Sequence, residues 1–262
     1  MHRLGLWVGG GVSMNEYAEN EVLQKRSLKE EVFQTLHRRI VAGKYAPGEW
    51  LRQEEISIQL GVSQTPVREA LDLLVSAGLA ERVPYRGVRV LQLTPVEIVD
   101  AYVLRLSLEV TAARLAACNI SDGQIAELYE TVEQTRQMVT LDDMSTQRQL
   151  NKKFHLSIVA AGGNALLTRH YEAVSNRFPD WMLYEYMFRH PELLESSLKR
   201  EYIEHKAIAD ALATHAPEQT VQMIVEHIRN LKQEFIAFLG IPDELLQEKE
   251  AQIAPLWTGA PP

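Results

Sequence analysis

Three of the chain's eight histidines are spaced so that they could converge on one metal ion. Asn151 and His155 lie four residues apart in a stretch with a helical pattern, so their side chains project from one helix face about one turn apart. His205 and His227 are equidistant from the Ala-Pro dipeptide at 216–217, which we interpret as the turn between two antiparallel helices, so they should face each other. If the helix that carries His155 packs alongside, three imidazoles and one amide oxygen meet.

These side chains predict a site for a divalent cation. Imidazole nitrogens with one oxygen ligand suit a late first-row ion such as Zn²⁺ or Ni²⁺ and leave positions for water or an anion. On spacing alone, each histidine could instead be structural, and the set could also form the zinc site of a metal-dependent enzyme. An enzyme is disfavoured because the sequence has no HExxH motif, Ser/His/Asp arrangement or glycine-rich phosphate motif. Glu204, next to a histidine of the set, should turn away from the metal.

The second part of the chain has the periodicity of a helical bundle. Thr94 to Glu97 forms a capping box with a proline at the first helical position, and the helix that begins there should run to about Cys118. Ser121 caps another helix that covers 125–139. Because strand signals are absent from this part, we expect an all-α body. Its further helical patterns run over approximately 142–161, 164–188, 191–213 and 217–239.

The first part of the chain has the pattern of a winged helix-turn-helix. Apolar residues four apart predict a helix over 28–42, and a short helix over 54–60 ends at Gly61. A third helix opens at the polar run Ser63 to Pro66. Two β-like stretches, 79–82 and 88–91, then flank a turn that contains Gly87, which predicts a two-stranded wing. The wing favours DNA binding over an ordinary helical pair.

The charge distribution agrees with a DNA-binding module on an acidic body. The 262 residues include 35 acidic and 27 basic side chains, a net charge of −8. Residues 24–94 hold 11 basic and 8 acidic side chains, a net charge of +3, and the remainder carries −11. The single cysteine, Cys118, excludes an internal disulfide and indicates a reducing compartment, so we expect a cytoplasmic protein. No apolar run approaches the roughly 20 residues that span a bilayer.

The segment KYAPGEWLRQEEISIQLGVSQTPVREALDLLVSAGLAERVPYRGVRV resembles the winged helix-turn-helix of the GntR family of bacterial transcription regulators, over roughly seventy residues. The string GVSxTPVREAL carries most of that likeness. Many family members have Arg where this chain has Gln64, and Gln pairs with adenine edges where Arg prefers guanine, which bears on the operator sequence. The resemblance implies that the recognition helix and the wing tip contact DNA through Ser63, Gln64, Thr65, Arg68, Arg86 and Gly87.

Each of these side chains also has a simpler interpretation. Arg68 could pair with Asp72 on an exposed helix face. Ser63 and Thr65 could act only as helix caps, although a cap residue can also contact DNA. Arg86 could be a solvated turn residue.

A second resemblance covers approximately residues 95–240. The motif Arg105-x-x-x-Glu109, the pair Phe-His at 154–155, the motif Glu-His-x-x-Ile at 204–208 and a histidine in the final helix are similar to the FadR-type C-terminal domain called FCD. The resemblance implies a divalent-metal site, and it implies small carboxylates as effectors in the bundle core. The family often has Asp where Asn151 stands, and an amide has one negative charge fewer for the cation. The implied metal ligands are Asn151, His155, His205 and His227.

Arg105 is the natural partner for an effector carboxylate, because a guanidinium can bind both oxygens. Its alternative role is an ion pair with Glu109 on the same helix, and the sequence does not choose between the two. Arg177 and Arg189 are further candidates for the carboxylate.

Together these patterns predict a mainly helical protein of two domains. The expected division is a flexible tail over 1–23, a winged helix-turn-helix over 24–93, an all-α FCD domain over 94–240 and a loosely held tail over 241–262. The expected function is a homodimeric transcription regulator, a repressor rather than an activator, on a palindromic double-stranded operator. A small organic acid at the metal would change its DNA affinity. A regulator whose metal is purely structural, or is itself the signal, is the alternative.

Overall fold

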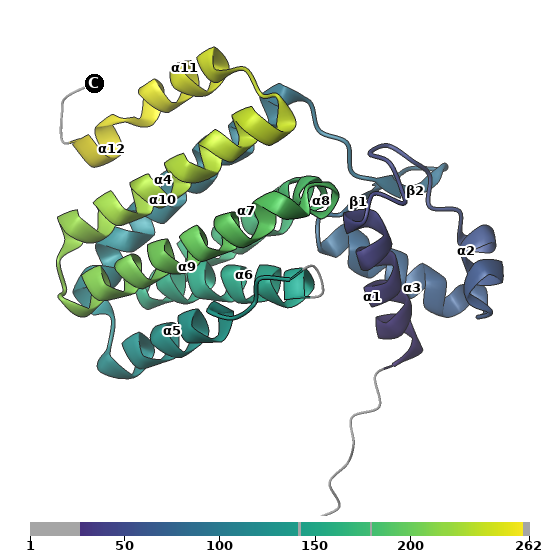
Figure 1. The fold of residues 1–262 in the computed structure, drawn as a ribbon, viewed down its shortest axis with the longest axis horizontal. Helices are drawn as coiled ribbons and strands as arrows, with labels where there is room; N and C mark the ends of the chain where they lie inside the picture. The colour runs from purple at the N-terminus through teal and green to yellow at the C-terminus, as the bar shows by residue number, and fades with distance from the viewer. Residues whose placement is uncertain (1–26, 141–142, 179, 259–262) are drawn as a thin grey trace, which may run out of the picture.

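The computed structural model describes residues 27–140, 143–178 and 180–258, apart from the side chains at 145, 176, 177 and 180. It consists of an N-terminal head, with three helices and a small β-wing, and a C-terminal helical body (Figure 1). The predicted fold class, a winged helix-turn-helix followed by a helical bundle, is confirmed. In the part of the chain that the structure describes, no helix is long and apolar enough to cross a membrane.

The head forms because each of its short helices has one apolar face and a strong stop signal. The second helix ends at Gly61, whose φ of 65° is the left-handed conformation that glycine adopts without strain. The third helix buries Val67, Ala70, Leu71 and Leu74, spaced along one helix face, against the first helix. The elements of the head are α1 (Leu28–Val41), α2 (Gln53–Leu60), α3 (Gln64–Ser76), β1 (Ala80–Val83) and β2 (Gly87–Val90).

The wing is an antiparallel hairpin, as the sequence predicts. β1 and β2 pair in register from Ala80 opposite Val90 to Val83 opposite Gly87. Tyr85 in the connecting turn has a φ of 62°, Gly87 at the start of β2 has a φ of 113°, and both residues are exposed. The hairpin therefore presents its turn to solvent at the tip of the head.

The body is built around its first helix, α4, which packs against α6, α7, α10 and α11. Thr94 caps α4 by accepting a hydrogen bond from the backbone of Glu97, and Ser121 caps α5 in the same way, as predicted. Tyr102 and Leu106 are fully buried along α4. The helices of the body are α4 (Pro95–Asn119), α5 (Asp122–Thr135), α6 (Met144–Ala161), α7 (Ala165–Arg177), α8 (Asp180–Arg189), α9 (Pro191–Ala213) and α10 (Pro217–Leu239).

One predicted helix, over 164–188, is in fact two. α7 ends at Arg177 and is followed by Phe178, whose φ of −65° and ψ of 133° are extended rather than helical. The next residue in the sequence is a proline, and steric conflict with the proline ring disfavours a helical conformation in the residue before it. The break lets α8 turn toward the head.

The described residues after Gly240, 241–258, are not the loosely held tail that the prolines of this segment suggest. They contain α11 (Asp243–Ile253) and α12 (Pro255–Thr258), and α11 packs along α4 (Figure 1). Leu246 is fully buried, and the carboxylate of Glu250 accepts hydrogen bonds from Tyr102 Oη at 3.2 Å and Arg229 Nε at 2.7 Å. Burial of Leu246 and these bonds fix the segment to the body.

The head contacts the body mainly through α1 and α8. Just after α1, Gly43 has a φ of 66°, and a Cβ atom added there would lie 2.6 Å from Arg189 Nη2 at the end of α8. The absence of a side chain at Gly43 therefore allows the arginine to approach the end of α1 closely.

Candidate metal centre and nucleic-acid interface

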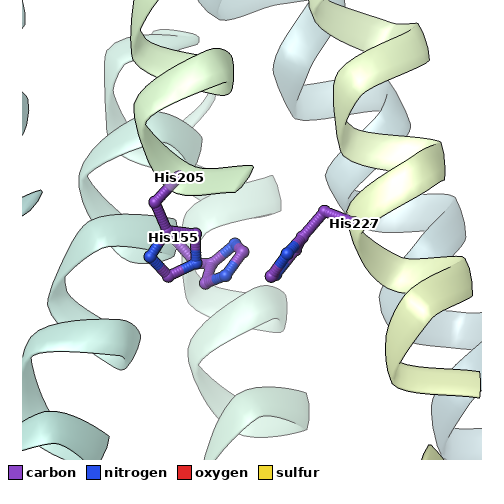
Figure 2. Close-up of side chains that lie close together, drawn as sticks. All are labelled: His155, His205 and His227. Atoms are coloured by element: carbon purple, nitrogen blue, oxygen red, sulfur yellow. The ribbon is translucent and has the colours of Figure 1, made fainter. Parts of the chain in front are cut away.

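His155, His205 and His227 converge in the centre of the body (Figure 2). They come from α6, α9 and α10, and one nitrogen atom of each ring lies within 4.8 Å of the other two. All three side chains are buried, and the ring centroids of His205 and His227 are 4.8 Å apart across the α9–α10 hairpin. The predicted convergence of the three imidazoles is confirmed.

The proton positions leave nitrogen atoms of the cluster available to a cation. Nδ1 of His155 lies 2.8 Å from Oε2 of Glu109, and a carboxylate can only accept, so Nδ1 carries the proton and donates it. Nε2 of His155 therefore keeps its lone pair. Among the described residues, Nε2 of His155 and Nε2 of His205 are buried without a hydrogen-bond partner. Such atoms are costly unless something binds them.

Glu109, on α4, is the most constrained carboxylate of the site. It is 2% exposed, and its Oε1 atom accepts hydrogen bonds from Arg105 Nε at 2.6 Å and Tyr171 Oη at 3.0 Å. Burial would raise the pKa of Glu109, but His155 and Arg105 outweigh it and hold that pKa below its ordinary value. Glu109 is therefore an anion that orients His155.

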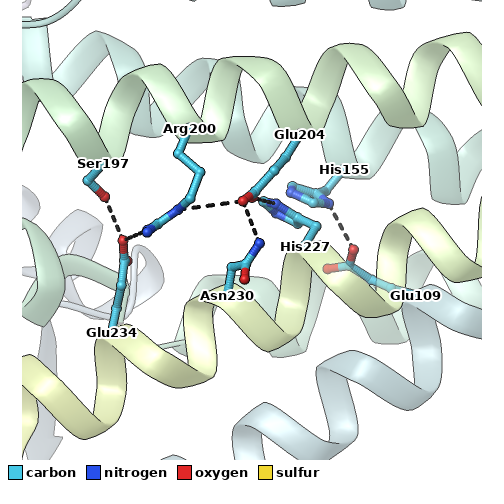
Figure 3. Close-up of polar contacts among 8 residues, drawn as sticks. All are labelled: Glu109, His155, Ser197, Arg200, Glu204, His227, Asn230 and Glu234. Atoms are coloured by element: carbon cyan, nitrogen blue, oxygen red, sulfur yellow. Dashed lines mark hydrogen bonds and ion pairs between the residues drawn. The ribbon is translucent and has the colours of Figure 1, made fainter.

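Glu204 performs the same role for His227 (Figure 3). Its Oε2 atom lies 2.7 Å from Nδ1 of His227, and its Oε1 atom accepts a hydrogen bond from Asn230 Nδ2 at 2.6 Å. The expectation that Glu204 turns away from the metal holds only in part, because its carboxylate lies directly behind a candidate ligand. The sequence reasoning missed both orienting glutamates. Their signal was a glutamate within one turn of Arg105 and one beside His205.

Burial keeps the imidazoles of His155 and His205 neutral. The pKa of His155 is lowered to about 4, because burial of the ring outweighs the opposing effect of the Glu109 carboxylate. The pKa of His205 is also lowered well below its ordinary value, by burial and then by the neighbouring His227 and His155. The ring of His205 also stacks on Phe154, with centroids 4.3 Å apart. Neutral, oriented imidazoles are the form that binds a transition metal.

Asn151 and Arg105 line a small cavity next to His227. The cavity has a volume of about 50 Å³ and is walled by side chains from α4, α6, α8, α9 and α10. Both interpretations of Arg105 have support, because it is paired with Glu109 and also faces this cavity, with its guanidinium 4.6 Å from the centre of the Phe178 ring. Arg189 does not line the cavity but pairs with Glu185. The side chain of Arg177 lies outside the described residues.

The predicted DNA-contacting residues of the recognition helix lie on one exposed end of the head. Ser63, Gln64, Thr65 and Arg68 are all exposed at the start of α3. Ser63 occupies the N-cap position without a side-chain hydrogen bond to the helix. Asp72 pairs with Arg82 of the wing instead of Arg68, and among the described residues Arg68 forms no ion pair.

The two predicted contacts in the wing are also at the surface. Arg86 is exposed in the turn between β1 and β2, beside Tyr85, and Gly87 is exposed at the first position of β2. Gln64, in contrast, is partly engaged, because Gln53 Nε2 donates to its Oε1 atom at 3.2 Å. That bond fixes the orientation of the Gln64 amide relative to α2.

Comparisons with protein families match both parts of the chain. Residues 28–90 match the family described as bacterial regulatory proteins, gntR family, and residues 100–230 match the FCD domain. The two matches coincide with the head and with most of the helical body.

Individual proteins are similar to the chain along most of its length. A probable D-xylose utilization operon transcriptional repressor of Paenarthrobacter nicotinovorans is 30% identical over 80% of this chain and 90% of that protein. The HTH-type transcriptional repressor RspR of Escherichia coli is 26% identical over 82% of this chain and 95% of that protein. The solved structure of E. coli McbR/YncC has a TM-score of 0.62 and 25% identity, and it covers 82% of this chain and all of that one.

Proposed function

The chain belongs to the gntR family of bacterial regulatory proteins and carries an FCD domain, and we propose that it is a repressor whose operator affinity is set by a small organic acid bound at a divalent-metal centre. Its relatives are transcription regulators and not enzymes. The proposal adds three elements to this family membership, namely the metal ion, the acid and the dimer on a palindromic operator.

The main support for a metal ion is that, among the described residues, the buried Nε2 atoms of His155 and His205 have no hydrogen-bond partner. The histidines fit a divalent cation because Glu109 and Glu204 already occupy the Nδ1 atoms of His155 and His227. Carboxylates behind ligating imidazoles fix the tautomer and raise ligand basicity. We assign Zn²⁺ or Ni²⁺ to His155, His205 and His227, with the amide oxygen of Asn151 as a fourth ligand.

The acid is expected between the metal centre and Arg105. A bound cation would supply a Lewis-acidic position for one carboxylate oxygen. Arg105 lines the adjoining cavity, and its guanidinium is held in place by Glu109 and the Phe178 ring. A guanidinium that is already oriented loses little freedom when it binds a second anion.

The size of this cavity suggests how binding would reach the head. With a volume of about 50 Å³, the cavity has room for one or two water molecules but not for an organic acid. An acid that binds there must therefore displace side chains that line the cavity. Leu183, Tyr184 and Met187 of α8 are among them, and α8 also contacts α1 of the head. Acid binding would therefore favour a different position of α8 and of the head.

On DNA, two heads related by a two-fold axis would read the halves of a palindrome. The exposed start of α3 would enter the major groove, with Arg68 and Gln64 at base edges and Arg86 in the minor groove. Because the head carries only a small excess of positive charge, specific side chains rather than bulk charge must determine operator choice.

A thermal-shift screen of organic acids against zinc-loaded protein would identify the effector, since a specific ligand raises the unfolding temperature. The operator dissociation constant is then measured with and without that acid at one stated salt concentration. We expect the acid to weaken operator binding. Turnover of the acid would contradict the proposal and indicate an enzyme.

The small cavity favours a second candidate, in which the metal ion is itself the signal or is purely structural. Chelation without any acid separates these roles. A metal sensor changes its operator affinity on chelation alone, whereas a structural site loses stability and DNA binding together.

A further inference from the structure

A second, larger cavity lies between the head and the body. Its volume is about 390 Å³, within the range of small-molecule sites, and α1 with the turn after it lines one side. The other side consists of residues of α6 and α8, among them Arg148, Tyr184 and Phe188. We propose that this cavity is a binding site for a small amphipathic organic anion, one with a carboxylate or sulfonate joined to an apolar ring or chain, separate from the metal centre.

The charge of the lining favours an anion. Arg38, Arg39 and Lys44 contribute cationic groups from the head and Arg148 contributes one from the body, while the described lining contains no carboxylate. Among the residues that the structure describes, Arg38 and Arg39 form side-chain hydrogen bonds with neutral groups alone, the Thr35 hydroxyl and the Gln59 amide. Like charges that face a shared recess raise its potential and attract an anion.

The rest of the lining favours an apolar group on the same ligand. Tyr184 is buried, whereas Phe188 is 37% exposed although it is a large apolar side chain. Met144 from the body and Val41 from the head complete an apolar wall of the cavity. A free phosphate or a DNA phosphate would use the arginines and leave this wall in water, whereas an amphipathic anion would cover it.

The position of the site gives it a regulatory consequence. A ligand held by Arg38 of α1 and Arg148 of α6 would fasten the head to the body in the described arrangement. Tyr184 lines both this cavity and the small cavity beside His227, so the two sites share this side chain. Filling the larger cavity should therefore influence the metal centre through Tyr184 and α8.

The site can be tested on the full chain with 8-anilinonaphthalene-1-sulfonate, an amphipathic anion whose fluorescence rises in an apolar site. We expect one probe per protomer, at least tenfold weaker binding in Arg38→Gln/Arg148→Gln, and weaker binding in Phe188→Ala. Arg114→Gln is the matched control, because Arg114 is an exposed arginine of the body far from the lining, paired with Glu218. The affinity of Arg114→Gln for the probe should equal that of the wild type.

Two further measurements separate loss of the site from misfolding and from loss of the metal centre. Circular dichroism and thermal unfolding verify that each variant is folded. His205→Ala, which removes a candidate metal ligand, should still bind one probe per protomer, with no more than the change in affinity that coupling through Tyr184 produces, so this site and the metal centre can fail independently. Equal binding by wild type and Arg38→Gln/Arg148→Gln would overturn the proposal, as would displacement of the probe by inorganic sulfate at the concentration that an organic carboxylate requires.

Discussion

Nδ1 of His155 lies 2.8 Å from Oε2 of Glu109, and the two side chains are 1% and 2% exposed. The bond joins α6 to α4 inside the body, and it fixes which nitrogen of His155 faces the other two histidines. Glu204 and His227 repeat the arrangement between α9 and α10 at 2.7 Å (Figure 3). In this set of three imidazoles, the Nδ1 atoms of His155 and His227 are therefore already occupied by carboxylates.

Glu109→Gln should weaken zinc binding by about 10- to 100-fold, because an amide is a poorer acceptor and lowers the basicity of His155. Competition with a fluorescent zinc chelator measures the affinity. Glu218→Gln removes an exposed glutamate of α10 and is the matched control. Equal affinity in Glu109→Gln and wild type would show that the His155–Glu109 bond does not serve metal binding.

Asn151→Asp should strengthen binding of the divalent cation by roughly tenfold, since one favourable charge interaction of about 1.4 kcal/mol corresponds to that factor. Asn151 lines the cavity beside His227, one helical turn before His155, and this chain has an amide there. The same competition assay reports the change. An unchanged affinity in both Asn151→Asp and Asn151→Ala would remove Asn151 from the ligand set.

The metal-free protein should lose stability as the pH falls from about 6.5 to 4. The pKa of His155 is lowered to about 4 by burial, so its ring stays neutral in the folded state while an unfolded chain takes up a proton in this interval. The contribution is fully present above pH 6.5 and decreases by roughly 1.4 kcal/mol per pH unit below it. Glu109 acts in the same direction at lower pH, since its pKa is also lowered.

Urea unfolding of chelator-treated protein at pH 7 and pH 5 measures this slope. In His155→Gln the dependence should be smaller, although the variant is less stable at pH 7. The prediction is wrong if wild type and His155→Gln lose the same free energy of unfolding between the two pH values.

Arg68→Ala should weaken operator binding by about 10- to 100-fold, the 1–3 kcal/mol expected for loss of a base contact. Arg68 is exposed on α3 and is not engaged by Asp72, which pairs with Arg82. Fluorescence anisotropy at a fixed salt concentration gives the dissociation constant. Arg114→Ala, on the body, controls for the loss of one positive charge, and equal affinities of the two variants would argue against a role of Arg68 on DNA.

Gly43→Ala should destabilise the protein by about 1 kcal/mol, because the φ of 66° is strained for any residue with a Cβ atom. The new methyl group would also meet the Arg189 guanidinium, which is largely exposed and can move. Chemical denaturation measures the loss. In the Arg189→Ala background, Gly43→Ala should lower the free energy of unfolding by nearly the same amount. If Gly43→Ala has no effect in that background, the destabilisation comes from the contact with Arg189 and not from backbone strain.

Much of the fold could be predicted from local patterns. The caps at Thr94 and Ser121 and the periodic apolar residues of the helix predicted over 28–42 depend on neighbours within one or two turns, and the structure confirms them. The two errors involve tertiary contacts or a single backbone feature. α11 is fixed by burial of Leu246 and by Glu250, which a proline-rich composition conceals, and the break at Phe178 depends on one proline in an otherwise periodic stretch.

The histidines of the candidate site could be predicted because a hairpin converts sequence symmetry into spatial proximity, as for His205 and His227. The contacts of the orienting carboxylates could not be predicted in this way, since Glu109 reaches His155 from a different helix. The size of the adjoining cavity, and the approach of Tyr184 to both cavities, depend on how α8 packs after the break. No local pattern contains that information.

The most direct test of the metal centre is a crystal of the zinc-loaded protein measured on both sides of the zinc absorption edge. We predict one strong anomalous peak per protomer within bonding distance of a nitrogen atom of His155, His205 and His227, and its absence in His205→Ala. A peak at any other group of side chains, or a peak that persists unchanged in His205→Ala, would contradict the assignment of these three histidines as the metal ligands.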